Sequence, residues 1–324
     1  MDSTLWVVTL VGLVAVFALD FVVAVRRPHA VSMREASLWT AFYVAAAIAF
    51  GVFIATQFGG EYAGQFYAGW LTEYSLSVDN LFVFVIIMSR FRVPRQSQQL
   101  VLLIGIALAL IMRAGFIALG AAAITRFSWV FYLFGAFLIY TAYHLAKHDE
   151  EESEEFRENR VIRWVKAVLP TTDVYDGNRF RTVVDGRKLF TPMLVVMVAI
   201  GTTDLLFALD SIPAIFGLTQ EPYLVFTANA FALMGLRQLY FLLGGLLDRL
   251  VFLSIGLAVV LGFIGVKLIL EALHTNTLPF INGGEHVEWA LKIPVTISLG
   301  VIVTVLVVTA IASLLHTRRG DRTG

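Results

Sequence analysis

The fold is decided by a polar stretch, EYSLSVDN at residues 73–80, which interrupts an apolar run long enough to cross a membrane. A second stretch, DLLFALDS at residues 204–211, repeats its spacing: one acid precedes another by six residues, and an amide or hydroxyl follows directly. An ionised carboxylate near the middle of a bilayer costs roughly 2.5 to 3.5 kcal/mol on insertion scales, so four of them need a neutralising partner. A bound cation is the most economical partner.

Composition indicates a membrane protein. Of 324 residues, 58% are hydrophobic and only 15% are charged, and the mean hydropathy is +0.80. Since a hydrocarbon core is spanned by roughly 20 apolar residues, we predict an all-α, polytopic fold of about nine transmembrane helices in a single membrane domain, residues 1–324. The expected helices lie near 4–25, 37–56, 67–89, 99–123, 128–146, 192–216, 223–247, 251–273 and 293–316. The absence of cysteine excludes disulfides and thiolate metal sites.

Basic residues indicate the orientation. They follow the first, third, fifth, seventh and ninth expected helices, whereas the alternate loops hold only Arg126 and Lys292. Because cytoplasmic loops carry the excess of lysine and arginine, we predict a multi-pass plasma-membrane protein with its N-terminus outside and its C-terminus in the cytoplasm. The first helix lacks a basic leader and a small-residue cleavage site, so we expect it to be retained. The loop at 147–190 is then cytoplasmic, and it contains an acidic run at 148–155 and a predicted amphipathic helix near 157–168.

Three helices on each side of that loop resemble one another. The first copy is 67–146 and the second is 192–273. Each has an acid pair, an arginine in the next helix and a glycine in the third: Glu73, Asp79, Asn80, Arg113 and Gly135 in the first, and Asp204, Asp210, Ser211, Arg237 and Gly262 in the second. The copies cross the membrane in opposite directions, as in secondary transporters whose substrate site lies at the repeat interface near the midplane. We therefore expect both acid clusters to meet there.

The spacing of the acids also predicts broken helices. Six residues on a regular helix leave Glu73 and Asp79 about 120° apart around the axis, so they do not share a face. Pro213 follows Asp210 by three residues and frees the carbonyl of Leu209. We therefore expect unwound backbone in both motifs to add oxygen ligands to the carboxylates.

The ligands available are oxygens. Carboxylates, amides, hydroxyls and carbonyls suit Mn²⁺, Mg²⁺ or Ca²⁺ and disfavour copper(I) and structural zinc. The expected metal ligands are Glu73, Asp79, Asn80, Asp204, Asp210 and Ser211, and the accessory residues are Asp20, Asn229, Arg113, Arg237 and Lys267. The three basic residues can pair with the acids when the ion leaves. Simpler roles remain open: the acids as hydrogen-bonded contacts between helices, Asp20 as a membrane-edge acid, the arginines as structural counterions, and Lys267 as the local partner of Glu271.

The same segments resemble a known family. Residues 73–84, 203–216 and 229–241 are similar to the signature segments of the TerC family of integral membrane proteins, and the similarity runs from about Asp20 to Leu270. The resemblance implies tellurium resistance or, in the branch that includes Alx, manganese export and metal supply to exported enzymes. It also implies that the acids of both motifs form the ion site, with Asn229 and Arg237 nearby. One departure is Gly201, where many relatives have a glutamate.

The expected function is therefore a secondary transporter that exports a divalent cation, with Mn²⁺ favoured over Ca²⁺ or Mg²⁺ as its substrate and with protons as the candidate coupling ion. Its partners are the metal ion and the lipid bilayer, with no nucleic acid, and no enzyme activity is expected. An intramembrane aspartyl protease is disfavoured, because the Tyr-Asp pair and Gly-x-Gly-Asp segment of those enzymes do not surround Asp79 or Asp210. The remaining alternative is a membrane scaffold that helps to metallate or insert other proteins, with indirect tellurium resistance.

Overall fold

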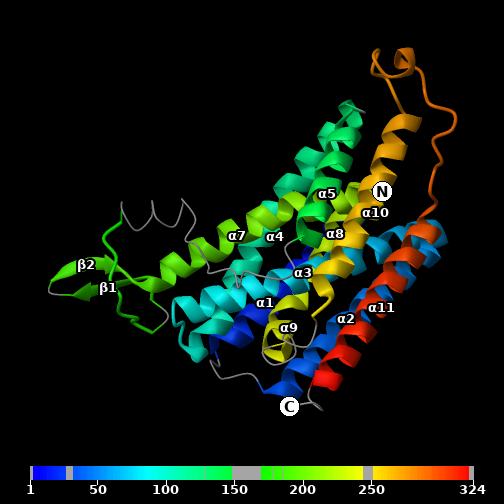
Figure 1. The fold of residues 1–324 in the computed structure, drawn as a ribbon. Coiled ribbons are helices and arrows are strands. Elements are labelled where there is room, and N and C mark those ends of the chain that lie inside the picture. The colour runs from blue at the N-terminus through cyan, green and yellow to red at the C-terminus, as the bar shows by residue number, and fades with distance from the viewer. Residues whose placement is uncertain are drawn as a thin grey trace.

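The computed structural model describes residues 3–26, 32–127, 129–147, 169–177, 179–184, 186–243 and 251–320, without the side chains of 20, 23–26, 79, 82 and 318–320. These ranges form a bundle of helices (Figure 1). The helices are α1 (Ser3–Arg26), α2 (Met33–Phe58), α3 (Gly60–Arg90), α4 (Arg95–Arg126), α5 (Val130–Lys147), α7 (Pro192–Phe216), α8 (Pro222–Met234), α9 (Leu236–Leu243), α10 (Leu253–His274) and α11 (Val295–Gly320). Seven of them, α2, α3, α4, α5, α7, α10 and α11, are long and apolar enough to cross a membrane. The all-α polytopic fold is thus confirmed.

The helices follow the predicted segments closely, with two differences. The third helix begins at Gly60, a full turn or more before the predicted start at 67. The segment predicted at 223–247 is interrupted at Gly235, so that α8 and α9 replace one helix across its described part. The apolar part of α1, Ser3–Leu19, is shorter than the seven long helices. A crossing by α1 or by α8 and α9 therefore stays a prediction.

Local sequence signals account for the helix ends. Ser32 caps α2, because its side-chain oxygen accepts a hydrogen bond from the backbone of Glu35 at 3.2 Å. Pro192 and Pro222 occupy first-turn positions of α7 and α8, where a missing N–H costs nothing. Gly59 joins α2 directly to α3 with φ at 100°, a conformation that favours glycine.

A β-hairpin occupies the described part of the loop before α7. Strands β1 (Arg181–Val184) and β2 (Arg187–Phe190) pair antiparallel, and the hairpin projects from the bundle beyond the start of α7 (Figure 1). Tyr175 ties this loop to the end of α3 by donating a hydrogen bond of 2.8 Å to the carbonyl of Phe91. Burial raises the pKa of Tyr175 to about 12, so the hydroxyl keeps its proton and donates at neutral pH. The predicted amphipathic helix and the acidic run fall at 148–168, outside the described residues.

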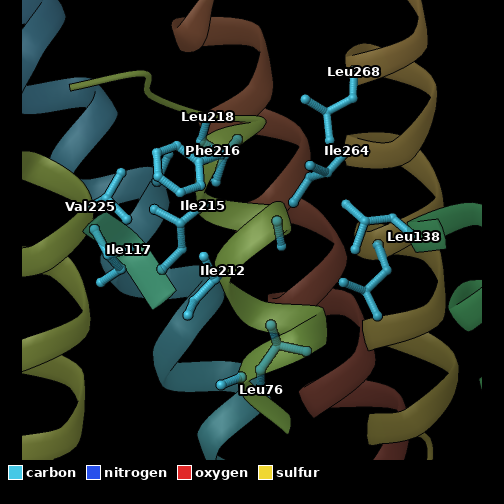
Figure 2. Packing of buried hydrophobic residues seen from close by; sticks show 14 of the residues in the cluster. Leu76, Ile117, Leu138, Ile212, Ile215, Phe216, Leu218, Val225, Ile264 and Leu268 are labelled. Atoms are coloured by element: carbon cyan, nitrogen blue, oxygen red, sulfur yellow. The ribbon is translucent and has the colours of Figure 1, made fainter. Parts of the chain in front are cut away.

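The helices before the loop pack against those after it. Contacts join α3 to α8, α4 to α7, and α5 to α10, and apolar side chains from these helices interlock in one core (Figure 2). Backbone approaches backbone at Gly135 of α5 and Gly265 of α10, where a Cβ atom on Gly135 would lie 2.8 Å from the Gly265 carbonyl oxygen. The first helix of one half packs on the second helix of the other, and the third helices pack on each other. Two halves related by symmetry would pair in this way, and the inverted repeat itself stays a prediction.

Candidate functional site

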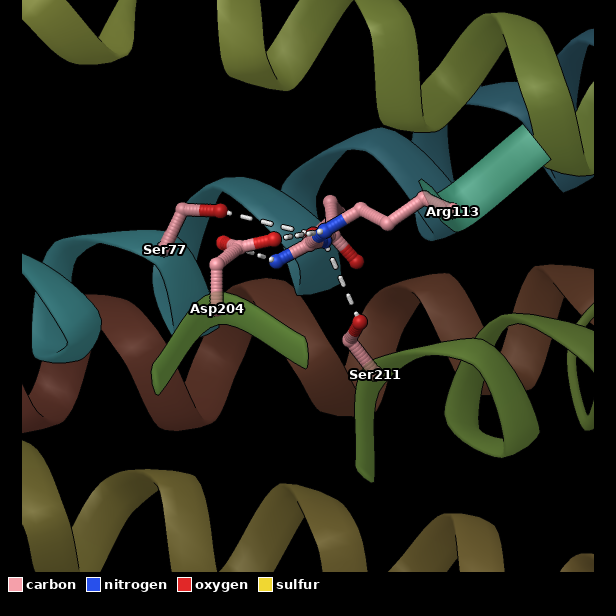
Figure 3. Close-up of polar contacts among 5 residues, drawn as sticks. Ser77, Arg113, Asp204 and Ser211 are labelled. Atoms are coloured by element: carbon pink, nitrogen blue, oxygen red, sulfur yellow. Dashed lines mark hydrogen bonds and ion pairs between the residues drawn. The ribbon is translucent and has the colours of Figure 1, made fainter. Parts of the chain in front are cut away.

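The centre of the bundle holds a fully buried arginine between two carboxylates. Arg113, on α4, donates from Nε and Nη2 to the two carboxylate oxygens of Asp204 on α7, at 3.1 and 3.0 Å. Its Nη1 forms an ion pair with Oε1 of Glu73 on α3 and donates to Ser211 Oγ at 3.2 Å. Ser77 completes the group by donating to Glu73 Oε1 at 3.4 Å (Figure 3). We call Glu73, Ser77, Arg113, Asp204 and Ser211 the central cluster.

The charges of the central cluster do not balance. Two carboxyl groups share one guanidinium, so with both acids ionised these five residues would carry one excess negative charge. Glu73 is fully buried, and its Oε2 has no hydrogen-bond partner in the described part of the chain. Taking charges out of water is expensive even when they are paired, and a buried group without a partner is costlier still. A cation or a proton would be stabilised here.

Two other predicted ligands, Asp210 and Asn80, lie outside the central cluster. Asp210 is half-buried and faces α5, where Thr141 donates a long hydrogen bond of 3.5 Å to its carboxylate. Asn80 is buried at 5% exposure, almost two turns beyond Glu73 on α3. The side chain of Asp79 is outside the described part, as is that of Asp20. The structure therefore brings Glu73, Asp204 and Ser211 together, and it separates Asp210 from them.

The predicted helix breaks are wrong. Helix α3 is continuous through both of its motif acids, and α7 is continuous through Pro213 until it ends at Phe216. Pro213 lies in the last turn of α7 and removes only its own hydrogen bond to the carbonyl of Leu209, so the helix continues to Phe216. The offset of about 120° between acids six residues apart is accommodated without unwinding, since Asp204 faces α4 whereas Asp210 faces α5. The interruption that does occur is at Gly235, between α8 and α9.

Of the predicted accessory residues, Arg113 belongs to the central cluster, whereas Lys267 lies apart from it. Arg237, on α9, is buried at 8% exposure. Asn229, on α8, is fully buried, and neither of its amide atoms has a hydrogen-bond partner within the described residues. Lys267, on α10, lies apart from the central cluster and donates to Ser298 Oγ of α11 at 3.1 Å. Arg113, expected as an accessory counterion, is the residue that joins the two motifs.

Three polar residues near the predicted acids, Thr141, Thr72 and Trp70, were not assigned a role from the sequence. Thr141 was missed because a lone hydroxyl in an apolar helix is common. Thr72 and Trp70 lie on α3 close to Glu73, and each buries a polar atom without a partner in the described chain. Gly201 packs against α4, where a Cβ would lie 2.9 Å from Leu108 Cδ2, so a glutamate there would require the leucine to shift.

Within the described residues, no three histidine, aspartate or glutamate side chains lie close enough together to hold a metal ion. A metal at the central cluster would therefore need Asp79, oxygen atoms other than carboxylates, or a displacement of Arg113. Asn80, Asp210 and Asn229 lie on α3, α7 and α8, and none of them makes a described contact with the central cluster.

Comparisons with known proteins agree with the resemblance of the motifs. The family described as integral membrane protein TerC matches residues 58–321. An uncharacterized membrane protein of Mycobacterium tuberculosis is 50% identical over 98% of this chain and 80% of its own length. Alx of Escherichia coli, which is named as a candidate membrane-bound redox modulator, is 35% identical over 98% of this chain and 96% of its own. The chloroplastic thylakoid membrane protein TERC of Arabidopsis thaliana is 44% identical over 71% of this chain and 60% of its own. No solved structure matches.

Proposed function

The chain belongs to the TerC family of integral membrane proteins, and from that premise we propose that it is a secondary transporter and not an enzyme. In this proposal it exports a divalent cation from the cytoplasm by alternating access, with Mn²⁺ as the favoured substrate and Ca²⁺ or Mg²⁺ as competitors. Protons entering from outside are the counter-ions. The distribution of basic loops supports a plasma-membrane location with the N-terminus outside.

One observation carries the proposal: acids from two separate motifs meet at the same buried arginine. Glu73 comes from α3 and Asp204 from α7, and Arg113 contacts both. A structural ion pair needs only one carboxylate for each arginine. The second carboxylate has an oxygen without a described partner. A transported cation would be stabilised by binding to it.

The guanidinium of Arg113 is a positive charge that belongs to the protein itself and lies in this site. In the empty state its guanidinium offsets part of the charge of the two carboxylates, which limits their mutual repulsion. When a divalent ion binds to oxygens of Glu73 and Asp204, Arg113 gives up at least one of its ion pairs, because both cations compete for the same oxygens. Release of the metal is favoured when Arg113 returns or when a proton occupies a carboxylate. Proton entry and metal exit are thereby coupled through one set of oxygens.

The test is Mn²⁺ transport by the purified protein in proteoliposomes. We expect Glu73→Gln, Asp79→Asn and Asp210→Asn to lower the initial rate by about tenfold or more, since a lost ligand worth 1.4 kcal/mol already has that effect. The matched control is Glu285→Gln, which removes an exposed acid in the loop before α11 and should leave the rate unchanged. Unaltered transport in all three variants would reject the site.

The scaffold alternative predicts a different result. A protein that only assists metallation or insertion of others would be folded in proteoliposomes yet would transport no Mn²⁺, Ca²⁺ or Mg²⁺. The name of the relative Alx refers to redox modulation. In this chain, which contains no cysteine, such a role could not use thiols of its own.

A further inference from the structure

A polar cavity lies at the end of the bundle opposite the hairpin. Its volume is about 290 Å³, and it is formed by the start of α3, the segment between α7 and α8, the end of α10 and the start of α11. Helix α7 begins directly after the hairpin and ends at this cavity, so the two lie a full helix length apart (Figure 1). The charged side chains that line it are Glu61, Glu221, Glu271, Lys267 and Lys292. Acidic side chains outnumber lysines in this lining, which favours a cation over an anion.

One face of α3 joins this cavity to the central cluster. Glu61 and Gln65 line the cavity, and Gly69, Thr72 and Glu73 follow at spacings of three and four residues. Such spacings place side chains on the same side of a helix. Gln65 and Glu73 are separated by slightly more than two helical turns, about 12 Å at 1.5 Å per residue. The route from cavity to carboxylate is therefore short.

Helix α8 faces this side of α3 and closes the route at one level. A Cβ atom on Gly69 would lie 3.3 Å from Ala228 Cβ and 3.3 Å from Ile215 Cγ2. These three small or apolar residues leave no room for water between the helices. We call Gly69, Ala228 and Ile215 the barrier.

Polar atoms without partners lie on the inner side of the barrier. Thr72 Oγ1, Glu73 Oε2 and both amide atoms of Asn229 are buried without hydrogen-bond partners in the described chain. Gly69 lies beside Ala228 and Tyr74 beside Gly235, so α3 and α8 run in the same direction, and Asn229 is one residue past the barrier. Buried groups of this kind are normally satisfied by water or an ion.

We infer that the transported cation leaves the central cluster along the α3–α8 interface, contacts Thr72 and Asn229, crosses the barrier when it opens, and exits through the polar cavity. This passage rests on the proposed function and adds to it a path and a gate. The barrier holds the path closed in the present conformation, while the cavity on its outer side is open. Small residues at the contact allow the helices to close tightly.

The absence of cysteine allows a direct test, since a single introduced cysteine is the only thiol. Glu221→Cys places it in the cavity, and Thr72→Cys places it beyond the barrier. A membrane-impermeant maleimide added to intact cells should modify the first and spare the second. Adding Ile215→Ala should raise the modification rate at position 72 by about tenfold or more, because truncating a buried isoleucine weakens the contact that closes the path.

The matched control is Ile106→Ala, an equal truncation in the separate apolar cluster around α4, which should leave the rate at position 72 unchanged. If Ile215→Ala does not fold, Ala228→Gly opens the same contact from α8. Fast modification at position 72 with the barrier intact, no change when it is truncated, or protection of position 221 would each overturn the passage. Labelling requires no transport, so a missing Mn²⁺ flux with this pattern intact would count against the substrate alone.

Discussion

Asp204 and Asp210 belong to one motif on one helix, yet their surroundings differ. Asp204 is buried at 1% exposure, and both of its oxygens accept hydrogen bonds from Arg113. Asp210 is half-buried, and its described contact is a single long hydrogen bond from Thr141. The bidentate pair with arginine fixes the geometry of the first acid, whereas the second retains oxygens that can bind something else.

This difference suggests a division of roles within the motif. Asp204 is held by a charge inside the protein, so removing it disturbs the fold as well as any site. Asp210 makes one weak described contact, so its substitution should change ligand binding more than it changes stability. Three pairs of variants test whether this contrast is real.

The largest effect is expected for Arg113→Met. This change leaves Glu73 and Asp204 buried without a counter-charge, and breaking a buried ion pair in this way costs about 3 to 5 kcal/mol. The measurement is chemical unfolding of the purified protein in detergent. Arg126→Met, at the exposed end of α4, is the matched control and should be close to wild type.

A second measurement separates charge from packing at Arg113. Neutralising both acids, with Glu73→Gln and Asp204→Asn, should restore part of the stability lost in Arg113→Met, because no uncompensated charge remains. If Arg113→Met alone is within about 1 kcal/mol of wild type, the upper end of the effect expected for surface pairs, the central cluster does not stabilise the fold.

An intermediate effect is expected when the two acids are compared directly. Asp204→Asn should lower stability by about 1.5 to 3 kcal/mol, the usual range for hydrogen bonds to charged groups. Asp210→Asn should cost less than about 1 kcal/mol, because a bond of 3.5 Å is at the limit of hydrogen-bond geometry. The same unfolding experiment measures both. Equal losses, or a larger loss for Asp210→Asn, would remove the contrast.

The smallest effect concerns the hydroxyl partners of the two acid sites. Ser211→Ala removes an acceptor from Arg113 and should cost about 1 kcal/mol. Thr141→Val removes the donor to Asp210 with little change in volume and should cost less than about 0.5 kcal/mol, given the same distance limit. Melting temperatures of the two variants provide the comparison. A larger effect at Thr141 would show that Asp210 is held more firmly than its geometry indicates.

Most helix positions followed from the sequence because apolar length is a strong signal in a membrane protein. The ends were less certain: α3 reaches back to Gly60 through polar residues that hydropathy alone excludes. The interruption at Gly235 was missed, since an isolated glycine in an apolar run is common. The hairpin was missed although Asp185-Gly186 lies between two short β-type runs, which is a recognised hairpin pattern.

The candidate site was harder to derive. The acids could be identified because charge is rare in apolar helices, but their partners could not, since several acids and arginines compete for pairing inside one bundle. The packing of both α3 and α4 against α7 determines that Arg113 reaches Asp204 and Glu73 together. The expected break in α3 was wrong because angular offset was treated as a reason to unwind, whereas two acids on one straight helix can face different neighbours.

The contact of Gly135 with Gly265 constrains how the two halves can move. Main chain touches main chain there, with no side chain between the helices to deform. This contact resists sliding, because neighbouring side chains such as Ile139 and Ile269 flank it on both helices. Helices α5 and α10 also share the most extensive contact between helices in the described part of the chain. We therefore expect them to move together in any rocking motion, with the relative displacements between this pair and the other helices.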